Sequence, residues 1–185
     1  MNKITGNWTV LSEKSVYENP WISVTEFNVI NPSGKAGIYG KVHYKNIAIG
    51  VIPIDQYRNI HLVGQYRFVL NKYSIEIPEG GGALNIDPLI SAKRELKEEL
   101  GLSADKWEKI LEMHLSNSVS DEFCIVYLAS ELKSGEPEPD DTEKLESIII
   151  PFDEAYKKVM NFEITDAISV AAILRIKLME QEKLK

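Results

Sequence analysis

The sequence contains almost no cysteine: Cys124 is the only one among 185 residues. This excludes a disulfide framework within the chain and is typical of a reducing compartment. Cys124 lies in the apolar run Phe123–Leu128, which predicts a buried thiol rather than a nucleophile. The chain also lacks long apolar runs, and its first ten residues are polar. We therefore expect no membrane-spanning helix, no membrane partner and no secretory signal, and we predict a cytoplasmic protein.

Positive charge is scarce as well. The chain has 21 Lys and Arg residues against 28 Asp and Glu residues, which gives a formal net charge of −7. No cluster of Lys and Arg resembles the basic face of a nucleic-acid-binding protein, so we expect no nucleic-acid partner. An acidic protein repels a phosphate-bearing substrate unless cations offset the repulsion locally. Metal ions would therefore have to be part of any phosphate-binding site.

The order of predicted elements indicates an α/β or α+β sandwich with helices packed on sheet. Runs rich in Val, Ile and Tyr predict strands at Ile22–Ile30, Ala36–Tyr44, Ile47–Ile54, Ile60–Tyr66 and Ser74–Ile77. A helix follows near residues 88–100. Strands are then predicted at Lys109–His114, Phe123–Ser130 and Glu146–Ile150, before two helices that begin near Asp153 and Asp166. The segment Lys133–Asp141 is rich in Pro, Gly and acid, which predicts a mobile loop.

The helix near residues 88–100 has clear start and stop signals. Apolar residues recur at helical spacing from Leu89 to Leu100. Asp87 is a favourable N-cap residue, Pro88 fits the first turn, and Gly101 stands where helices commonly end.

Three glutamates crowd one side of this helix. Glu95 and Glu99 lie within ~40° of each other beside the apolar stripe, and Glu98 lies ~60° to the other side of Glu95. Carboxylates at the edge of burial repel each other unless a cation lies between them, and hard oxygen ligands on a rigid helix suit Mg²⁺. The alternative is an exposed acidic helix that pairs with Lys93 and Lys97, and the spacing alone does not decide between the two.

The sequence around the helix resembles the Nudix box. Residues 80–102 read GGGALNIDPLISAKRELKEELGL. The box is Gly, five residues, Glu, seven residues, Arg-Glu, an aliphatic residue, any residue, Glu-Glu, any residue, Gly and an aliphatic residue. A match of this length and spacing is highly specific. The one departure is Ile86, which stands where the box has its first glutamate.

This resemblance implies a Mg²⁺ site, in which Mn²⁺ can substitute. It implies that Glu95 and Glu99 are metal ligands and that Glu98 is a further ligand or a near neighbour. The backbone carbonyl of Glu79 would complete the metal shell, and Arg94 would orient a glutamate of the helix. Because all three glutamates are present, we favour hydrolysis over the alternative, a Nudix-like module that binds nucleotide sugars without cleaving them.

Further motifs resemble the ADP-ribose and nucleoside diphosphate sugar pyrophosphatases of the Nudix family. They are Gln65-Tyr66-Arg67, Glu76-Ile77-Pro78 before Gly80, the run SNSVSDE at 116–122 and the run ITDA at 164–167. The resemblance implies metal-dependent hydrolysis of the pyrophosphate bond of a nucleoside diphosphate sugar. ADP-ribose, cleaved to AMP and ribose 5-phosphate, is the favoured substrate; GDP-mannose and other sugar nucleotides are further candidates.

Several residues near the box are candidates for substrate binding. Arg67 suits bidentate binding of a phosphate, or pairing with an acidic neighbour. Glu76 suits metal binding through water, or pairing with Arg67. Gly80 and Gly81 allow the backbone to approach the pyrophosphate closely, although a simple tight turn would also use them.

By the same resemblance, the segment Lys133–Glu146 carries the acid that activates water. Glu143 is our first choice and Asp141 the second, and Glu98 completes the predicted catalytic set. About two or three Mg²⁺ ions would neutralise charge on the phosphates while water attacks one phosphorus in line.

The resemblance also implies a division of the chain. Residues 1–44 would form a small antiparallel β-sheet that makes a homodimer and shapes the base pocket, and residues 45–185 would form a Nudix-type α/β/α sandwich. Trp21 is the best candidate for stacking on the nucleobase, with a core position in the small sheet as the alternative.

Overall fold

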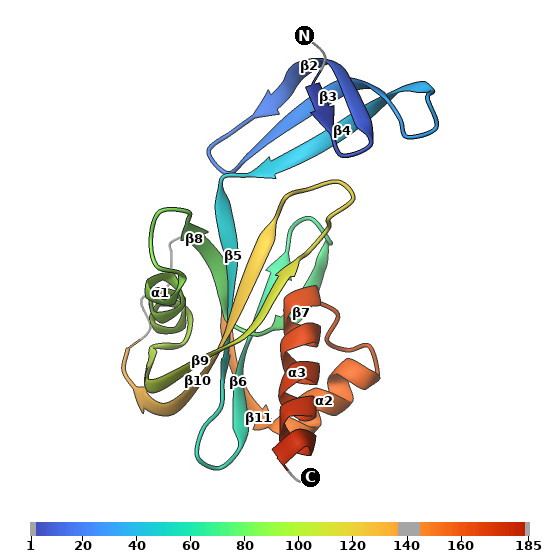
Figure 1. Cartoon of the computed structure of the whole chain (residues 1–185). Coiled ribbons are helices and arrows are strands. Elements are labelled where there is room, and N and C mark those ends of the chain that lie inside the picture. The colour runs from blue at the N-terminus through green and yellow to red at the C-terminus, as the bar shows by residue number, and fades with distance from the viewer. Residues whose placement is uncertain (1–2, 137–144, 184–185) are drawn as a thin grey trace. The chain divides into compact units, whose positions relative to one another are not determined.

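The computed structural model describes residues 3–136 and 145–183 and divides into two compact units (Figure 1). The first unit comprises Met1–Ile47 and His114–Phe123, and the second comprises Ala48–Met113 and Cys124–Lys185. The end of the first segment lies three residues beyond the boundary expected at residue 44. The return of residues 114–123 to the first unit has no counterpart in the sequence prediction.

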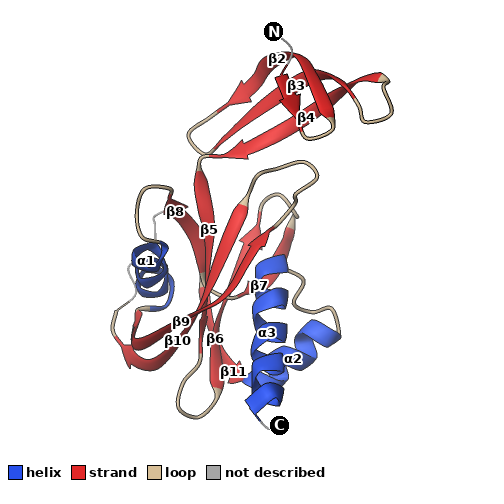
Figure 2. Cartoon of the chain, in the orientation of Figure 1, coloured by secondary structure: helices blue, strands red, loops and turns tan. Residues whose placement is uncertain are grey.

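The first unit contains a four-stranded antiparallel sheet in the order β1 (Lys3–Thr5), β2 (Trp8–Glu18), β3 (Ile22–Ile30), β4 (Ala36–Tyr44) (Figure 2). Strands β3 and β4 have the predicted bounds. The Asn31 side chain shapes the turn between them, because its Oδ1 accepts hydrogen bonds from the backbone N–H groups of Ser33 and Lys35 at 3.0 and 2.9 Å. Strands β1 and β2 were not predicted, since most of their side chains are exposed and polar.

The second unit contains two sheets. One has the order β8 (Glu79–Ala83), β5 (Asn46–Pro53), β10 (Phe123–Ser134), β9 (Leu102–His114), and the other has the order β11 (Glu146–Pro151), β6 (Asn59–Arg67), β7 (Lys72–Glu76). Strands β5 and β10 are parallel, and β6 pairs antiparallel with both of its neighbours. Strand β8 is formed by the glycine run, which was predicted only as a turn or close approach.

Three helices flank these sheets: α1 (Pro88–Leu100), α2 (Phe152–Met160) and α3 (Ala167–Lys183). Helix α1 lies on one side of the sheets, and α2 and α3 lie on the other (Figure 1). The predicted mixed α/β sandwich is therefore confirmed. Within residues 3–136 and 145–183, no helix is long and apolar enough to cross a membrane.

Two strand ends differ from the sequence prediction by more than two residues. Strand β9 begins at Leu102, seven residues before the predicted start at Lys109, because it follows α1 almost directly. Strand β10 runs to Ser134, so Lys133 is in a strand and not in the predicted loop. The added residues, 102–108 of β9 and 131–134 of β10, are mostly polar. A search for apolar runs therefore does not find them.

The core of the second unit is centred on β5 and β6. Ile49, Val51 and Ile52 have no exposed surface, as expected for a strand between two others with both faces covered. Helix α3 packs directly on this strand: a Cβ at Gly50 would lie 2.7 Å from Cγ2 of Ile168.

Gly50→Ala should therefore destabilise the protein by about 1–3 kcal/mol, because the added methyl group overpacks the contact between β5 and α3. Urea unfolding measures this change. Gly37→Ala is the control, since a Cβ there meets nothing within 4 Å. Equal stability of the two variants would contradict the close packing at Gly50.

Candidate functional site

Helix α1 carries two buried glutamates, as the helical spacing predicts. Glu95 is 6% exposed and Glu99 is 7% exposed, whereas the side chain of Glu98 is partly exposed. Lys93 and Lys97 lie on the exposed face. The alternative of an exposed acidic helix is therefore wrong for Glu95 and Glu99.

Arg94 connects this helix to the glycine run. Its guanidinium donates to the carboxylates of Glu95 and Glu98, and Nη2 also donates to the carbonyl oxygen of Gly81 at 2.9 Å. The guanidinium of Arg94 thus holds two glutamates of α1 and the backbone of β8 in place. This is the geometry expected of a residue that orients helix glutamates.

Gly80 lies directly against the Glu95 carboxylate. A Cβ at residue 80 would be 2.3 Å from Cδ and 2.3 Å from Oε1 of Glu95, so any other residue here would displace that carboxylate. The backbone of β8 approaches the carboxylate this closely because residue 80 is glycine. Buried carboxylates and backbone groups of α1 and β8 therefore share one small space.

A second group of charges lies beside this space. Nε of Arg67 donates to both carboxylate oxygens of Glu76 at 3.0 Å, and Nη2 donates to Oε1 of Glu79 at 2.6 Å. One carboxylate oxygen each of Glu76, Glu79 and Asp166 lies within 4.8 Å of the other two. Arg67 therefore has acidic neighbours, as one of its two predicted roles requires.

The electrostatics of Glu79 are unfavourable. Burial raises the pKa of its carboxyl well above the usual 4.5, and the negative charges of Asp166 and Glu76 raise this pKa further, against the opposing effect of Arg67. Its Oε2 is buried and has no hydrogen-bond partner among the described residues. A cation near these carboxylates would relieve the burial and the repulsion together.

The chemistry of these groups fits a hard divalent cation. The available ligand atoms are carboxylate and backbone oxygens, which are the ligands that Mg²⁺ and Mn²⁺ prefer. The buried oxygen of Glu79 and the close approach of Gly80 to Glu95 are the two structural observations that favour a bound cation.

Ile86 contributes nothing polar where the box has a glutamate. Its side chain is 45% exposed. The neighbouring Asp87 caps α1 instead, because its Oδ1 accepts a hydrogen bond from the backbone N–H of Leu89 at 3.0 Å. Neither residue replaces the glutamate expected at this position.

The 116–122 segment forms a turn in the first unit. Asp121 pairs with Lys41 at 2.7 Å and with Nδ1 of His43 at 2.8 Å, and it accepts from the backbone N–H of Tyr44 at 3.0 Å. Burial opposes ionisation of Asp121, but these hydrogen bonds prevail and hold its pKa below the usual 3.8. A structural role in the turn accounts for this residue.

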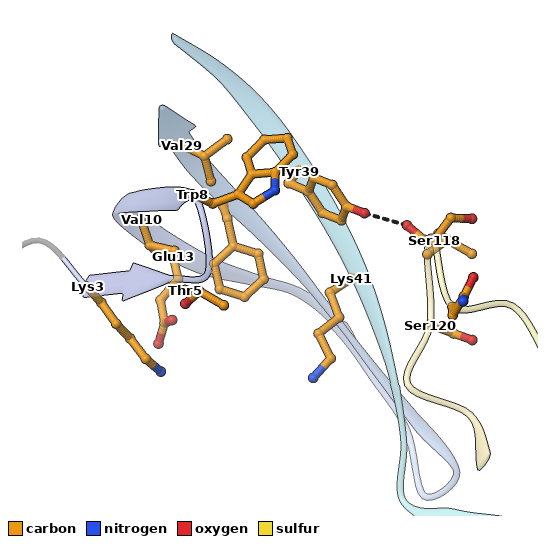
Figure 3. Close-up of a pocket in the computed structure, with 13 residues that line it drawn as sticks. Lys3, Thr5, Trp8, Val10, Glu13, Val29, Tyr39, Lys41, Ser118 and Ser120 are labelled. Atoms are coloured by element: carbon orange, nitrogen blue, oxygen red, sulfur yellow. Dashed lines mark hydrogen bonds between the residues drawn. The ribbon is translucent and has the colours of Figure 1, made fainter. Parts of the chain in front are cut away.

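The first unit also contains a cavity of about 450 Å³ (Figure 3). Trp8 and Tyr39 line it with their rings edge to face, 5.3 Å apart between centroids, and the Tyr39 hydroxyl donates to the carbonyl oxygen of Ser118 at 2.6 Å. Lys41 reaches toward the same space. Trp21 does not line this cavity and is 64% exposed, which excludes a core position for it.

Some candidate site residues were missed by sequence analysis, and others lie outside the described residues. Asp166 was interpreted only as a helix start, and Glu79 only through its backbone carbonyl. Trp8 and Tyr39 were not singled out, because an aromatic residue in a strand carries no signal of function. Asp141 and Glu143 fall within residues 137–144, which the structure does not describe.

Two family models match consecutive parts of the chain. A model described as the NUDIX domain matches residues 45–169, and one described as the nucleoside diphosphate sugar hydrolase N-terminal domain matches residues 8–42.

Known proteins resemble the chain in sequence and in fold. It is 33% identical to the ADP-ribose pyrophosphatase of Mycobacterium tuberculosis over 134 aligned residues. This alignment covers 70% of this chain and 64% of that protein. It is 31% identical to the ADP-ribose pyrophosphatase of Bacillus subtilis, with 92% of each chain covered. A crystal structure of an ADP compounds hydrolase superposes with a TM-score of 0.86 over 98% of both chains, at 19% identity, which shows the shared fold.

Glu79→Gln should stabilise the metal-free protein increasingly as the pH rises above about 4.5. The raised pKa of Glu79 means that its contribution to stability is present below the unfolded-state pKa and is lost as the pH rises toward the folded-state pKa. Glutamine does not titrate, so the difference in unfolding free energy between the variant and the wild type should be larger at pH 8 than at pH 5. Urea unfolding in EDTA measures it.

Asp153→Asn is the control for this measurement. Hydrogen bonds from Arg58 and Lys177 lower the pKa of Asp153 below its usual 3.8. Its effect on stability should therefore be the same at pH 5 and pH 8. A pH-independent effect of Glu79→Gln would contradict the raised pKa.

Proposed function

The chain belongs to the NUDIX hydrolase family, and from this premise we propose that it hydrolyses the pyrophosphate bond of a nucleoside diphosphate sugar. ADP-ribose, cleaved to AMP and ribose 5-phosphate, is the favoured substrate, with GDP-mannose and other sugar nucleotides as further candidates. The observation that carries the proposal is the buried pair Glu95 and Glu99 on α1, with the Glu95 carboxylate against the backbone of Gly80. The names of the two bacterial relatives support ADP-ribose.

Glu95 and Glu99, together with Glu98 and the backbone carbonyl of Glu79, would hold Mg²⁺, for which Mn²⁺ can substitute. A divalent cation supplies positive charge for the phosphates and makes a water molecule easier to deprotonate. Arg94 keeps Glu95 and Glu98 in place through the contacts described above. It orients the ligands and does not itself contact the substrate.

The remaining residues bind the substrate and move a proton. Gly80 and Gly81 let the backbone approach the pyrophosphate, and Arg67 at the end of β6, held by its pair with Glu76 at the end of β7, would bind a phosphate of the substrate. Glu143, or Asp141, takes the proton of the attacking water. The oxygen of that water then forms a bond to one phosphorus as the bond from this phosphorus to the bridging oxygen breaks. The leaving phosphate carries the bridging oxygen away.

We assign base recognition to the first unit. The cavity beside Trp8 and Tyr39 presents aromatic surface and the cation of Lys41, which suit a nucleobase with attached phosphates. We also propose a homodimer formed through this unit, because its sheet exposes large apolar side chains such as those of Ile4 and Ile38. The exposed Trp21 does not line this cavity, so it would add to base binding only as a secondary contact across such a dimer. The single, buried Cys124 supports a cytoplasmic location.

Hydrolysis is tested by release of AMP from ADP-ribose with Mg²⁺ and with EDTA, alongside GDP-mannose, ADP-glucose and UDP-glucose. We expect cleavage only with the metal, fastest for ADP-ribose. Glu99→Gln should lower kcat at least about 100-fold, since each loss of about 1.36 kcal/mol in the transition state is a factor of ten. Lys93→Gln, on the exposed face of α1, should leave kcat unchanged.

Near-normal turnover by Glu99→Gln would contradict the metal assignment. If the wild type binds ADP-ribose but cleaves none of these substrates, the chain is a non-catalytic binding module. Ile86→Glu, which restores the missing box residue, would then be the variant to assay for recovered hydrolysis.

The base site is tested by comparing Trp8→Ala with Trp21→Ala. Trp8→Ala should raise KM for ADP-ribose about tenfold with a smaller change in kcat, because stacking contributes about 1 kcal/mol or more to binding. Trp21→Ala should have a smaller effect on KM, since Trp21 does not line the cavity. Steady-state kinetics measure KM for both variants. If only Trp21→Ala raised KM, the assignment of the base site to the cavity would be wrong.

A further inference from the structure

Three carboxylates meet around a single guanidinium where β7, β8 and α3 come together in the second unit. Glu76 ends β7, Glu79 begins β8, and Asp166 immediately precedes α3. Arg67 contacts Glu76 and Glu79, as described above. Glu76 is 2% exposed, and Glu79 is mostly buried.

We propose that Glu76, Glu79 and Asp166 form a second divalent-cation site, to which each contributes one carboxylate oxygen, and that it holds a different ion from the adjoining site of Glu95 and Glu99 on α1. The proposal concerns ion binding and does not depend on the proposed hydrolysis. It gives the side chain of Glu79 a role of its own, distinct from that of its backbone carbonyl.

The balance of charge around the cluster favours a cation. Three carboxylates carry a charge of −3 when ionised, and Arg67 supplies +1. The N-terminus of α3 next to Asp166 adds only roughly half an elementary charge. One guanidinium serves several carboxylates here, so it offsets only part of the repulsion between these mostly buried acids. A divalent cation would offset it.

Glu79 provides a second and independent observation. Its Oε1 accepts a hydrogen bond from Arg67, but its Oε2 is buried and has no hydrogen-bond partner among the described residues. A buried carboxylate oxygen without a partner is costly for a folded protein. A cation bound by Oε2 would satisfy this atom directly.

The spacing of the oxygens is suitable for one ion. One oxygen from each of Glu76, Glu79 and Asp166 lies within 4.8 Å of the other two. Hard divalent cations bind oxygen at about 2.0–2.6 Å, so two ligands of the same ion are at most roughly 4–5 Å apart. All three oxygens can therefore reach one ion with small movements.

Asp166 is held firmly enough to serve as a ligand. Its Oδ2 accepts a hydrogen bond from the backbone N–H of Ser169 at 2.7 Å, and Oγ of Ser169 accepts one from the backbone N–H of Ile77 at 2.9 Å. Ser169 is completely buried. These bonds connect the start of α3 to the chain between Glu76 and Glu79, and they leave the second oxygen of Asp166 to the cation.

The test is a titration of the full chain with Mn²⁺, in which free Mn²⁺ is measured by electron paramagnetic resonance. Asp166→Asn should bind one Mn²⁺ fewer per chain than the wild type, or bind it at least tenfold more weakly, and Glu79→Gln should lose the same ion. Glu99→Gln should lose a different ion, so the double variant Asp166→Asn with Glu99→Gln should lose both.

Both cluster variants are conservative. Asparagine caps helices about as well as aspartate, so α3 should stay intact, and glutamine keeps the size and the backbone of residue 79. Glu163→Gln is the matched control: this exposed acid lies near Asp166 and pairs with Lys158 instead, so its replacement should leave Mn²⁺ binding unchanged. Circular dichroism melts in EDTA verify that each variant is folded.

Wild-type Mn²⁺ stoichiometry and affinity in folded Glu79→Gln or folded Asp166→Asn would overturn the proposal. If one of the two variants fails to fold, the other decides. A wild-type protein that releases no AMP from ADP-ribose would refute the proposed hydrolysis, whereas the Mn²⁺ count of the cluster would be unaffected by that result.

Discussion

The backbone of Gly80 lies so close to the carboxylate of Glu95 that even a methyl group at residue 80 would displace the carboxylate. Arg94 supports this contact, since it donates hydrogen bonds to the Glu95 carboxylate and to the carbonyl oxygen of Gly81. The register of β8 against α1 is fixed as a result. Oxygen atoms from the strand and from the helix are brought together before any ligand binds, so little ordering is left for the ligand to impose.

The sequence predicted the local part of this arrangement well. The bounds of α1 and the burial of Glu95 and Glu99 follow from helical periodicity, because positions four residues apart share one face. The contribution of Asp166 could not be predicted in this way, since it lies about ninety residues from Glu76 and meets it only through the packing of α3. Strand β2 was missed because its exposed polar side chains carry no periodic signal.

Repulsion between carboxylates connects the site to the stability of the protein. Burial of several acids in the second unit opposes folding, and Arg67 and Arg94 each offset only part of the negative charge around them. Metal ions that bind only the folded state would stabilise it by mass action, and this would offset the free-energy cost of burying these acids. Metal concentration should therefore influence folding and ligand binding together.

The return of residues 114–123 to the first unit has a consequence during synthesis on the ribosome. Val42 in β4 bridges to Ser120, and Asp121 binds Lys41 and His43, so this sheet lacks part of its own unit until the returning turn has been made. Some seventy residues of intervening chain, which include α1, must emerge first. The N-terminal sheet is thus synthesised first, but its unit is complete only when residues 114–123 have been synthesised. This happens after α1, the helix that carries Glu95 and Glu99, has been made.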